Sequence, residues 1–229
     1  MPRSSVPAAV TLALLFDLDG TLMDTLDAIL TAMNAALAGI REPALSREEL
    51  RPLIGMPVAR QMAVLRGMDA ETAAAVNDRY YVHFQQLVRK GVALYPGVRE
   101  GLQALSPRPM TTVSTRRREV ARLMLRTAGI ESPFTVVVGG DEVSRSKPAP
   151  DLVLHAAHAL GRSPAECVVV GDSPVDIAAG RAAGAWTVAV MYGYGSSAEL
   201  QASGPHREVA RFDGVLEAVA SLEREAAKP

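Results

Sequence analysis

Short apolar runs that alternate with helical patterns limit the folds open to this chain. Five such runs fit buried strands: Val10–Phe16, Met110–Ser114, Phe134–Gly139, Cys167–Gly171 and Trp186–Val190. They are continuous rather than alternating in polarity, which is typical of parallel strands covered by helices on both faces. Amphipathic patterns predict the intervening and final helices at Val98–Leu105, Arg117–Ala128, Pro150–Leu160, Pro174–Ala183 and Val215–Glu225. The sequence therefore predicts an α/β fold with a doubly wound, Rossmann-like parallel sheet.

Residues 25–92 interrupt this alternation. The stretch contains several amphipathic helical patterns and no convincing strand. We therefore expect two domains, an α/β catalytic core formed by residues 1–24 and 93–229 and an inserted α-helical cap formed by residues 25–92.

Composition and charge exclude several classes of protein. With 229 residues, 48% of them hydrophobic, the chain is long enough to bury a sizeable core. The net charge of −1 gives no global field that points to nucleic acid or a membrane surface. We read the three arginines at 116–118 as a solvated helix start, with Arg116 facing a cleft, rather than as a nucleic-acid patch. We expect neither a nucleic-acid nor a membrane partner.

The N-terminus and the single cysteine bear on location. Arg3 and the apolar residues after it loosely imitate a signal peptide, but this apolar run leads directly into an acidic cluster that cleavage would damage. We expect a disordered tip followed by the first strand. Cys167 has no partner for an intrachain disulfide, which favours a reducing compartment, so we expect a cytoplasmic protein.

Acidic, hydroxyl and lysine side chains follow the predicted strands. Asp17 and Asp19, in the stretch FDLDGTLMD, come directly after the first strand. Ser114 and Thr115 end the second strand, Asp172 follows the strand at 167–171, and Lys147 precedes the helix at 150–160. Sites in open parallel sheets form at the carboxyl ends of the strands. Neighbouring carboxylates repel one another unless a cation lies between them, and Mg²⁺ prefers such oxygen ligands. The sequence predicts a site for Mg²⁺ and a phosphate group.

Four motifs in this order resemble those of the haloacid dehalogenase-like (HAD) superfamily. They are FDLDGTLMD, TVSTRRR around Ser114, SKPAPD around Lys147, and GDSPVDIAAGRAAG with Asp172 and Asp176. The resemblance covers nearly the whole chain, in the branch whose helical cap lies between the first and second motifs. RPLIGMPVAR, in the predicted cap, is similar to the substrate-specificity loop of the family, so that Arg51 and Arg60 are candidates to meet an anionic substrate.

The resemblance implies a covalent mechanism. Asp17 is expected to be the nucleophile that forms an aspartyl-phosphate, and Asp19 the general acid and then the general base. Mg²⁺ is expected to be held by the Asp17 carboxylate, the Asp19 backbone carbonyl and Asp172, with Asp176 supporting these ligands from behind.

The resemblance also implies which residues bind the phosphate and neutralise its charge. Ser114 and backbone amides near Leu18 and Thr115 are expected to bind the transferring oxygens, and Arg116 the substrate. Lys147 is expected to neutralise charge between the nucleophile and the phosphate.

Several activities fit this scaffold. The leading expectation is a Mg²⁺-dependent phosphatase that acts, as a monomer or homodimer, on a small phosphorylated metabolite. ALYPGV and AVMYGYG resemble stretches of phosphoglycolate phosphatases, whereas TRRR resembles the related pyrophosphatases. A sugar phosphate fits equally well as the substrate.

Three further alternatives fit less well. Sugar-phosphate mutases on this scaffold usually carry an acidic residue where this chain has Gly171, and dehalogenases lack the carboxylate of Asp19. A binding protein without activity would be expected to have lost a catalytic residue, and none is missing.

Overall fold

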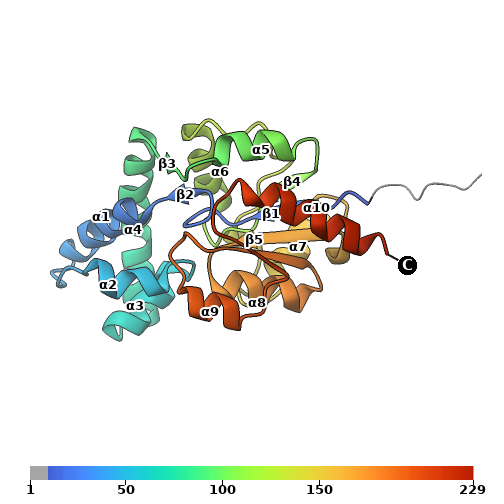
Figure 1. Cartoon of the computed structure of the whole chain (residues 1–229). Helices are drawn as coiled ribbons and strands as arrows, with labels where there is room; N and C mark the ends of the chain where they lie inside the picture. Colours follow the sequence, from blue (N-terminus) through green and yellow to red (C-terminus); the bar gives the residue numbers. More distant parts are fainter. Residues whose placement is uncertain (1–9, 229) are drawn as a thin grey trace, which may run out of the picture.

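A parallel five-stranded sheet forms the centre of the protein (Figure 1). The structure is a computed structural model that describes residues 10–228, so the expected disordered tip before Val10 lies outside the described residues. The strand order is β4-β1-β5-β6-β7, with β1 at Ala13–Phe16, β4 at Met110–Thr112, β5 at Cys167–Gly171, β6 at Trp186–Val190 and β7 at Arg207–Val209. The chain winds to both sides of β1, which confirms the predicted doubly wound α/β fold. Ligand sites in such sheets form at this switch point.

Helices cover both faces of the sheet. Leu14 and Phe16 of β1 share a core with α5 (Val98–Leu105), α6 (Arg118–Thr127) and α10 (Gly214–Ala226). Ala13 and Leu15 point to the opposite face and share a core with α7 (Asp151–Ala159) and α8 (Pro174–Ala183). Burial on both faces explains why the strand sequences are apolar throughout.

The predicted strand at Phe134–Gly139 is wrong. This segment runs along the edge strand β4, but a side chain replaces part of the backbone ladder. The Thr112 hydroxyl donates to the Val138 carbonyl (2.6 Å) and accepts from the Val138 amide (2.8 Å). Apolar composition alone does not distinguish such an extended, side-chain-bonded segment from a strand.

The sheet ends with a strand that we did not predict. β7 has the sequence REV and pairs with β6 through its backbone. As an edge strand, β7 pairs on one side only and is less buried than the central strands, so polar residues are tolerated in it. A polar segment of this kind is not recognised as a strand from its sequence.

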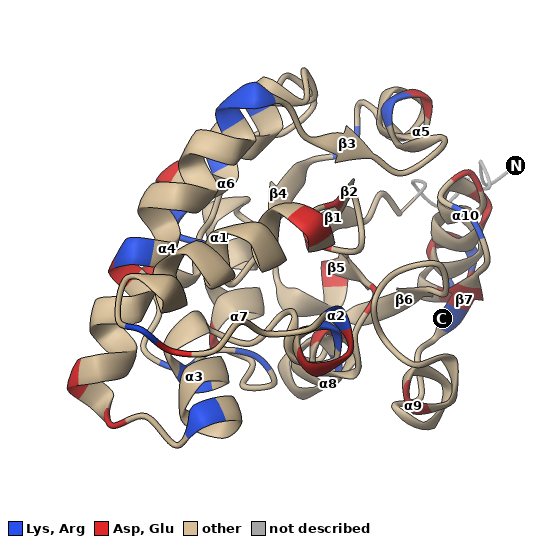
Figure 2. Ribbon diagram, turned by 90° about the vertical axis from the view of Figure 1, so that its left-hand side faces the viewer, with Lys and Arg blue, Asp and Glu red and all other residues tan. Residues whose placement is uncertain are grey.

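Residues 26–90 form a layer of helices beside the sheet (Figures 1 and 2). The layer contains α1 (Leu26–Ala38), α2 (Arg47–Leu50), a 3₁₀ turn at Arg51–Leu53, α3 (Val58–Arg66) and α4 (Ala70–Lys90). α4 packs against α1 and α3, with Tyr80 and Phe84 fully buried and their rings stacked at 5.4 Å. None of the helices within residues 10–228 is long and apolar enough to cross a membrane.

A short antiparallel ribbon lies where the chain leaves the sheet for this layer and returns. β2 (Met23–Asp24) pairs with β3 (Ala93–Leu94). The two domain boundaries expected from the sequence fall at this ribbon, and the division into two domains remains a prediction. The remaining elements are α9 (Ser197–Ala202) and 3₁₀ turns at Gly140–Glu142 and Pro164–Glu166.

Candidate active site

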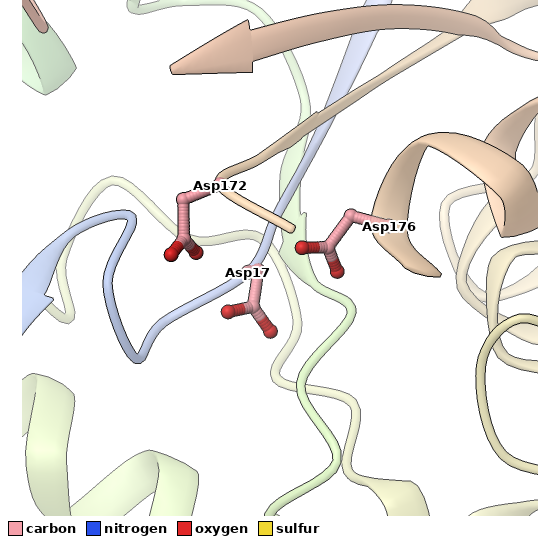
Figure 3. A group of neighbouring side chains, drawn as sticks. All are labelled: Asp17, Asp172 and Asp176. Carbon is pink, nitrogen blue, oxygen red and sulfur yellow. The ribbon is translucent and has the colours of Figure 1, made fainter. Parts of the chain in front are cut away.

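Three aspartates from separate elements converge at the carboxyl end of the sheet (Figure 3). Asp17 follows β1, Asp172 follows β5, and Asp176 lies in the first turn of α8. All three are buried, and one carboxylate oxygen of each lies within 4.8 Å of the others. The backbone amide of Asp17 donates to the Val170 carbonyl (3.0 Å), which continues the pairing of β1 with β5 beyond the last strand residue. The sheet therefore fixes the spacing of the Asp17 and Asp172 backbones.

Lys147 lies among these carboxylates. Its Nζ donates to Asp17 Oδ1 (2.8 Å) and to Asp176 Oδ1. Burial by itself would lower the pKa of Lys147, but the neighbouring Asp17 and Asp176 carboxylates raise it above the ordinary value. Lys147 is therefore a permanent cation at this site.

Burial acts in the opposite sense on the acids. It raises the pKa of Asp17 well above its ordinary value, against the opposing effect of Lys147. Burial and the charge of Asp176 raise the pKa of Asp172 to about 7. The raised pKa values show that Lys147 by itself does not offset the cost of burying these acids in their ionised form.

The charge balance fits a divalent metal ion. Within residues 10–228, the buried cluster contains Asp17, Asp19, Asp172 and Asp176 against the cations Lys147 and Arg116, so two negative charges would be uncompensated when all four acids are ionised. Oxygen ligands of this kind suit Mg²⁺. Gly20 allows the backbone of the first motif to approach Asp172 closely, because a Cβ at this position would lie 2.2 Å from Asp172 Oδ2.

Asp176 lies close to the expected metal ligands. Its carboxylate is one of the three that could hold a metal, and its expected role in supporting the ligands from behind remains a prediction. Its Oδ2 accepts from the Ser173 amide (3.1 Å) and hydroxyl (2.5 Å), which leaves Oδ1 towards Lys147.

The side chain of Asp19 lies on another side of the site. Its carboxylate accepts from Arg116 Nε (2.7 Å), Arg116 Nη2 (3.1 Å) and the Thr25 hydroxyl (2.5 Å). The Arg116 guanidinium also donates to the Tyr80 hydroxyl and lies 4.1 Å from the centre of the Phe84 ring. Arg116 thereby connects Asp19 to helix α4.

The other predicted phosphate ligands lie around these groups. Ser114 is buried, and its hydroxyl accepts from the Arg116 amide (3.2 Å). Leu18 is buried between Asp17 and Asp19, and Thr115 lines a small cavity together with Asp19 and Arg116. Every site residue predicted outside the cap thus lies at one end of the sheet.

Several residues that hold the site were not predicted. The Thr21 hydroxyl and the Tyr194 amide donate to Asp172 (2.9 and 2.8 Å). The Tyr194 hydroxyl accepts from the Thr25 and Leu26 amides (2.5 and 2.9 Å) and donates to Asp24 (3.0 Å), so it supports the start of α1. The only sequence signals were the position of Thr21 inside the first motif and the YGYG stretch around Tyr194.

The two cap arginines occupy other positions. Arg51 donates to the carbonyls of Tyr194 (3.3 Å) and Gly193 (3.2 Å). Arg60 is exposed. In this conformation neither side chain is presented to the acidic cluster.

Comparison with known proteins identifies the family. Residues 14–190 match the family described as haloacid dehalogenase-like hydrolase. The chain belongs to this family. The family and the fold class predicted from the sequence are confirmed.

Named relatives of this HAD-like hydrolase are phosphatases. A phosphoglycolate phosphatase of Chromobacterium violaceum is 34% identical over 198 residues, which cover 83% of this chain and 89% of that protein. A phosphoglycolate phosphatase of Xanthomonas campestris is 34% identical over 185 residues, 80% of this chain and 84% of that protein. These names agree with the predicted phosphatase class.

Solved structures share the fold of this HAD-like hydrolase. A hydrolase from Pseudomonas syringae superposes with a TM-score of 0.80 at 26% identity, covering 92% of this chain and 99% of that one. A β-phosphoglucomutase from Clostridium difficile gives the same TM-score at 18% identity, covering 94% and 98%. The second likeness shows the fold alone, so the fold does not separate phosphatases from mutases.

Proposed function

We propose that this chain is a Mg²⁺-dependent phosphatase that hydrolyses a small phosphorylated metabolite, of the phosphoglycolate or sugar-phosphate kind, through an aspartyl-phosphate on Asp17. The observation that carries the proposal is the buried convergence of Asp17, Asp172 and Asp176 around Lys147, with Asp19 beside them. The named relatives support the choice of phosphate ester. The cytoplasmic location expected from the single cysteine belongs to the same proposal.

In the first step, an Asp17 carboxylate oxygen attacks phosphorus and the bond from phosphorus to the alcohol oxygen breaks. Lys147 binds Asp17 Oδ1, which orients the carboxylate, and its charge opposes the repulsion between Asp17 and an incoming phosphate. The amides near Leu18 and Thr115, with the Ser114 hydroxyl, donate to the transferring oxygens.

Asp19 transfers a proton in each of the two steps. As the acid it protonates the departing alcohol oxygen, and as the base it takes a proton from the water that then attacks the aspartyl-phosphate. That second attack releases inorganic phosphate and restores the Asp17 carboxylate. The Thr25 hydroxyl and Arg116 fix the direction of the Asp19 carboxylate.

The metal would be held by Asp17 and Asp172, with the Asp19 backbone carbonyl and Asp176 as further candidates. When bound, Mg²⁺ supplies charge that stabilises the transferring phosphoryl group. Thr21 and the Tyr194 amide orient Asp172 for this role.

A steric observation disfavours a phosphomutase. A Cβ at Gly171 would lie 2.4 Å from the Asp176 Cβ. The acidic residue that sugar-phosphate mutases on this scaffold usually carry at this position has no room here unless α8 moves.

We also propose that residues 25–92 form a mobile cap hinged at the β2–β3 ribbon, which closes to exclude water from the site. Small-angle scattering with and without Mg²⁺ and vanadate tests this motion. An unchanged radius of gyration would contradict it.

The function is tested by phosphate release from a panel of phosphorylated metabolites. We expect turnover with Mg²⁺, none in excess chelator, and none in Asp17→Asn. Asp78→Asn, a change at an exposed acid on α4, serves as the matched control and should retain activity. Full turnover in chelator, or in Asp17→Asn, would contradict the proposal.

A further inference from the structure

A small, partly open cavity lies next to Asp19, between the helical layer and the sheet. Its volume is about 20 Å³, and its lining includes Asp19, Thr115 and Arg116 from the sheet side and Ile54, Gln61 and Tyr80 from the helical layer. If Asp19 protonates the departing alcohol oxygen, the rest of the alcohol must lie beside Asp19. This cavity is therefore the place for the leaving group, a step that rests on the proposed function.

Gln61 carries an unused hydrogen-bond acceptor at this cavity. The side chain is 3% exposed, and its Nε2 donates to the carbonyls of Leu53 (3.1 Å) and Met56 (2.9 Å). Backbone carbonyls only accept hydrogen bonds, so the amide nitrogen of Gln61 must be the atom that faces them. The amide oxygen, Oε1, is therefore not used in these two bonds. Within the described part of the chain, the buried Gln61 Oε1 has no hydrogen-bond partner.

A buried acceptor without a donor is unfavourable, and a ligand that supplies the donor removes this penalty. The other polar groups of the cavity do not supply it. The Arg116 guanidinium is directed to Asp19 and Tyr80, and the two Nε2 bonds hold the amide against the loop at residues 53–56. The donor must come from what enters the cavity.

We propose that Gln61 Oε1 selects the substrate by accepting a hydrogen bond from a free hydroxyl on the leaving alcohol. The substrate class is a compact phosphate ester of two or three carbons that keeps at least one hydroxyl besides the esterified oxygen. With about 20 Å³ the cavity has room for about one water molecule in this conformation, so the helical layer must move to admit the leaving group, and a compact leaving group requires the smallest movement. An ester without a second hydroxyl, such as 2-phosphoglycolate, leaves the acceptor unpaired and is a poorer substrate, which narrows the proposed function to hydroxyl-bearing esters.

Two esters that differ only in that hydroxyl test the inference. D-3-phosphoglycerate carries it on the second carbon, and 3-(phosphonooxy)propanoate lacks it. We expect the native enzyme to favour the first by about tenfold or more in kcat/KM, because sites with buried polar groups reject analogues that leave them unpaired. Gln61→Met, which cannot accept this bond, should bring the ratio of the two kcat/KM values close to one.

The ratio separates selection from a structural role. Gln61→Met also removes the two bonds to the 53–56 loop, and damage of that kind lowers kcat/KM for both esters alike without changing their ratio. Ile54→Val alters the same lining without a polar atom and should leave the ratio as in the native enzyme. An equal kcat/KM for both esters in the native enzyme, or an unchanged ratio in Gln61→Met, overturns the inference. Turnover of 2-phosphoglycolate with neither three-carbon ester accepted also overturns it.

A binding measurement keeps this test apart from that of the proposed function. Absence of phosphate release from every ester contradicts the phosphatase itself. Calorimetric titration with the two leaving alcohols, D-glycerate and 3-hydroxypropanoate, then decides the inference without turnover. Tighter binding of glycerate that disappears in Gln61→Met supports it, and equal binding of the two alcohols overturns it.

Discussion

Arg116 and Asp19 form a buried ion pair in which two guanidinium nitrogens donate to one carboxylate, at 2.7 and 3.1 Å. The pair joins residues 97 positions apart, and the guanidinium also contacts Tyr80 and Phe84 of α4. A side chain of the second motif thus holds Asp19, the proposed acid and base of the first motif, against the helical layer.

Arg116→Lys should therefore impair proton transfer more than binding. An ammonium cannot reproduce the two-bond fork or the stacking on Phe84. We expect kcat to fall by about tenfold or more for alkyl phosphates, which need a proton on the departing oxygen. The loss should be smaller for p-nitrophenyl phosphate, whose leaving group needs little protonation. Steady-state kinetics on both esters check this, and equal losses would assign Arg116 to binding instead.

Lys147→Arg should abolish most activity. Only three lysines occur beside 21 arginines, and Lys147 is the one whose ammonium lies between two buried carboxylates. A planar guanidinium is wider and directs its donors differently. An error of about 1 Å in a preorganised site can cost on the order of 10²-fold in rate, and we expect at least that loss. Phosphate release and thermal unfolding are compared with Lys90→Arg and Lys228→Arg, two exposed controls that should match the native protein. Turnover at the native rate in Lys147→Arg would show that the shape of the Lys147 ammonium is not needed and that its assigned role is wrong.

Mg²⁺ should bind more tightly as the pH rises through 7. Without a metal, burial and Asp176 raise the pKa of Asp172 to about 7, so protons compete with the metal below that pH. Calorimetric titrations at pH 6 and pH 8 should give a dissociation constant about tenfold larger at pH 6. Asp78→Asn should retain this dependence, and an equal affinity at both pH values would exclude Asp172 as a ligand.

Glu223 should make stability depend on pH. Its carboxylate binds Arg108 Nε and Nη2 (both 2.9 Å) and accepts from the Leu12 amide (3.1 Å). Burial opposes ionisation, but these bonds lower the pKa of Glu223 below its ordinary value of 4.5. The pair therefore stabilises the fold above pH 4.5, and this contribution is lost as the pH falls through the folded-state pKa.

Denaturant unfolding of Glu223→Gln checks this effect. We expect the free energy of unfolding to fall at pH 7 by about 1.5 kcal/mol, the lower end of the usual range for hydrogen bonds to a charged group, because the pair is only partly buried. The difference from the native protein should narrow as the pH drops below 4.5. Glu217→Gln breaks an exposed pair on the same helix and should change stability little at either pH. A constant difference between Glu223→Gln and the native protein would show that the charge of Glu223 does not matter.

The sequence determined the order of the elements and the residues at the strand ends. Helices α5 and α8 begin and end where the hydrophobic pattern places them, because that pattern is a local property of consecutive residues. Asp17 and Asp172 could be placed together without coordinates, since parallel strands present their carboxyl ends at one edge of a sheet.

Only the tertiary structure decided which atoms meet. The Thr112 hydroxyl that displaces a predicted strand, the Asp176 oxygen beside Asp17, the Arg116 fork on Asp19 and the unpaired oxygen of Gln61 leave no periodic trace in the sequence. Each depends on side-chain direction and on the packing of segments far apart in the chain. The Asp19 carboxylate turns away from the other acids because Arg116, Thr25 and the aromatic face of α4 surround it, and hydrogen-bond geometry in a packed interior allows few alternatives.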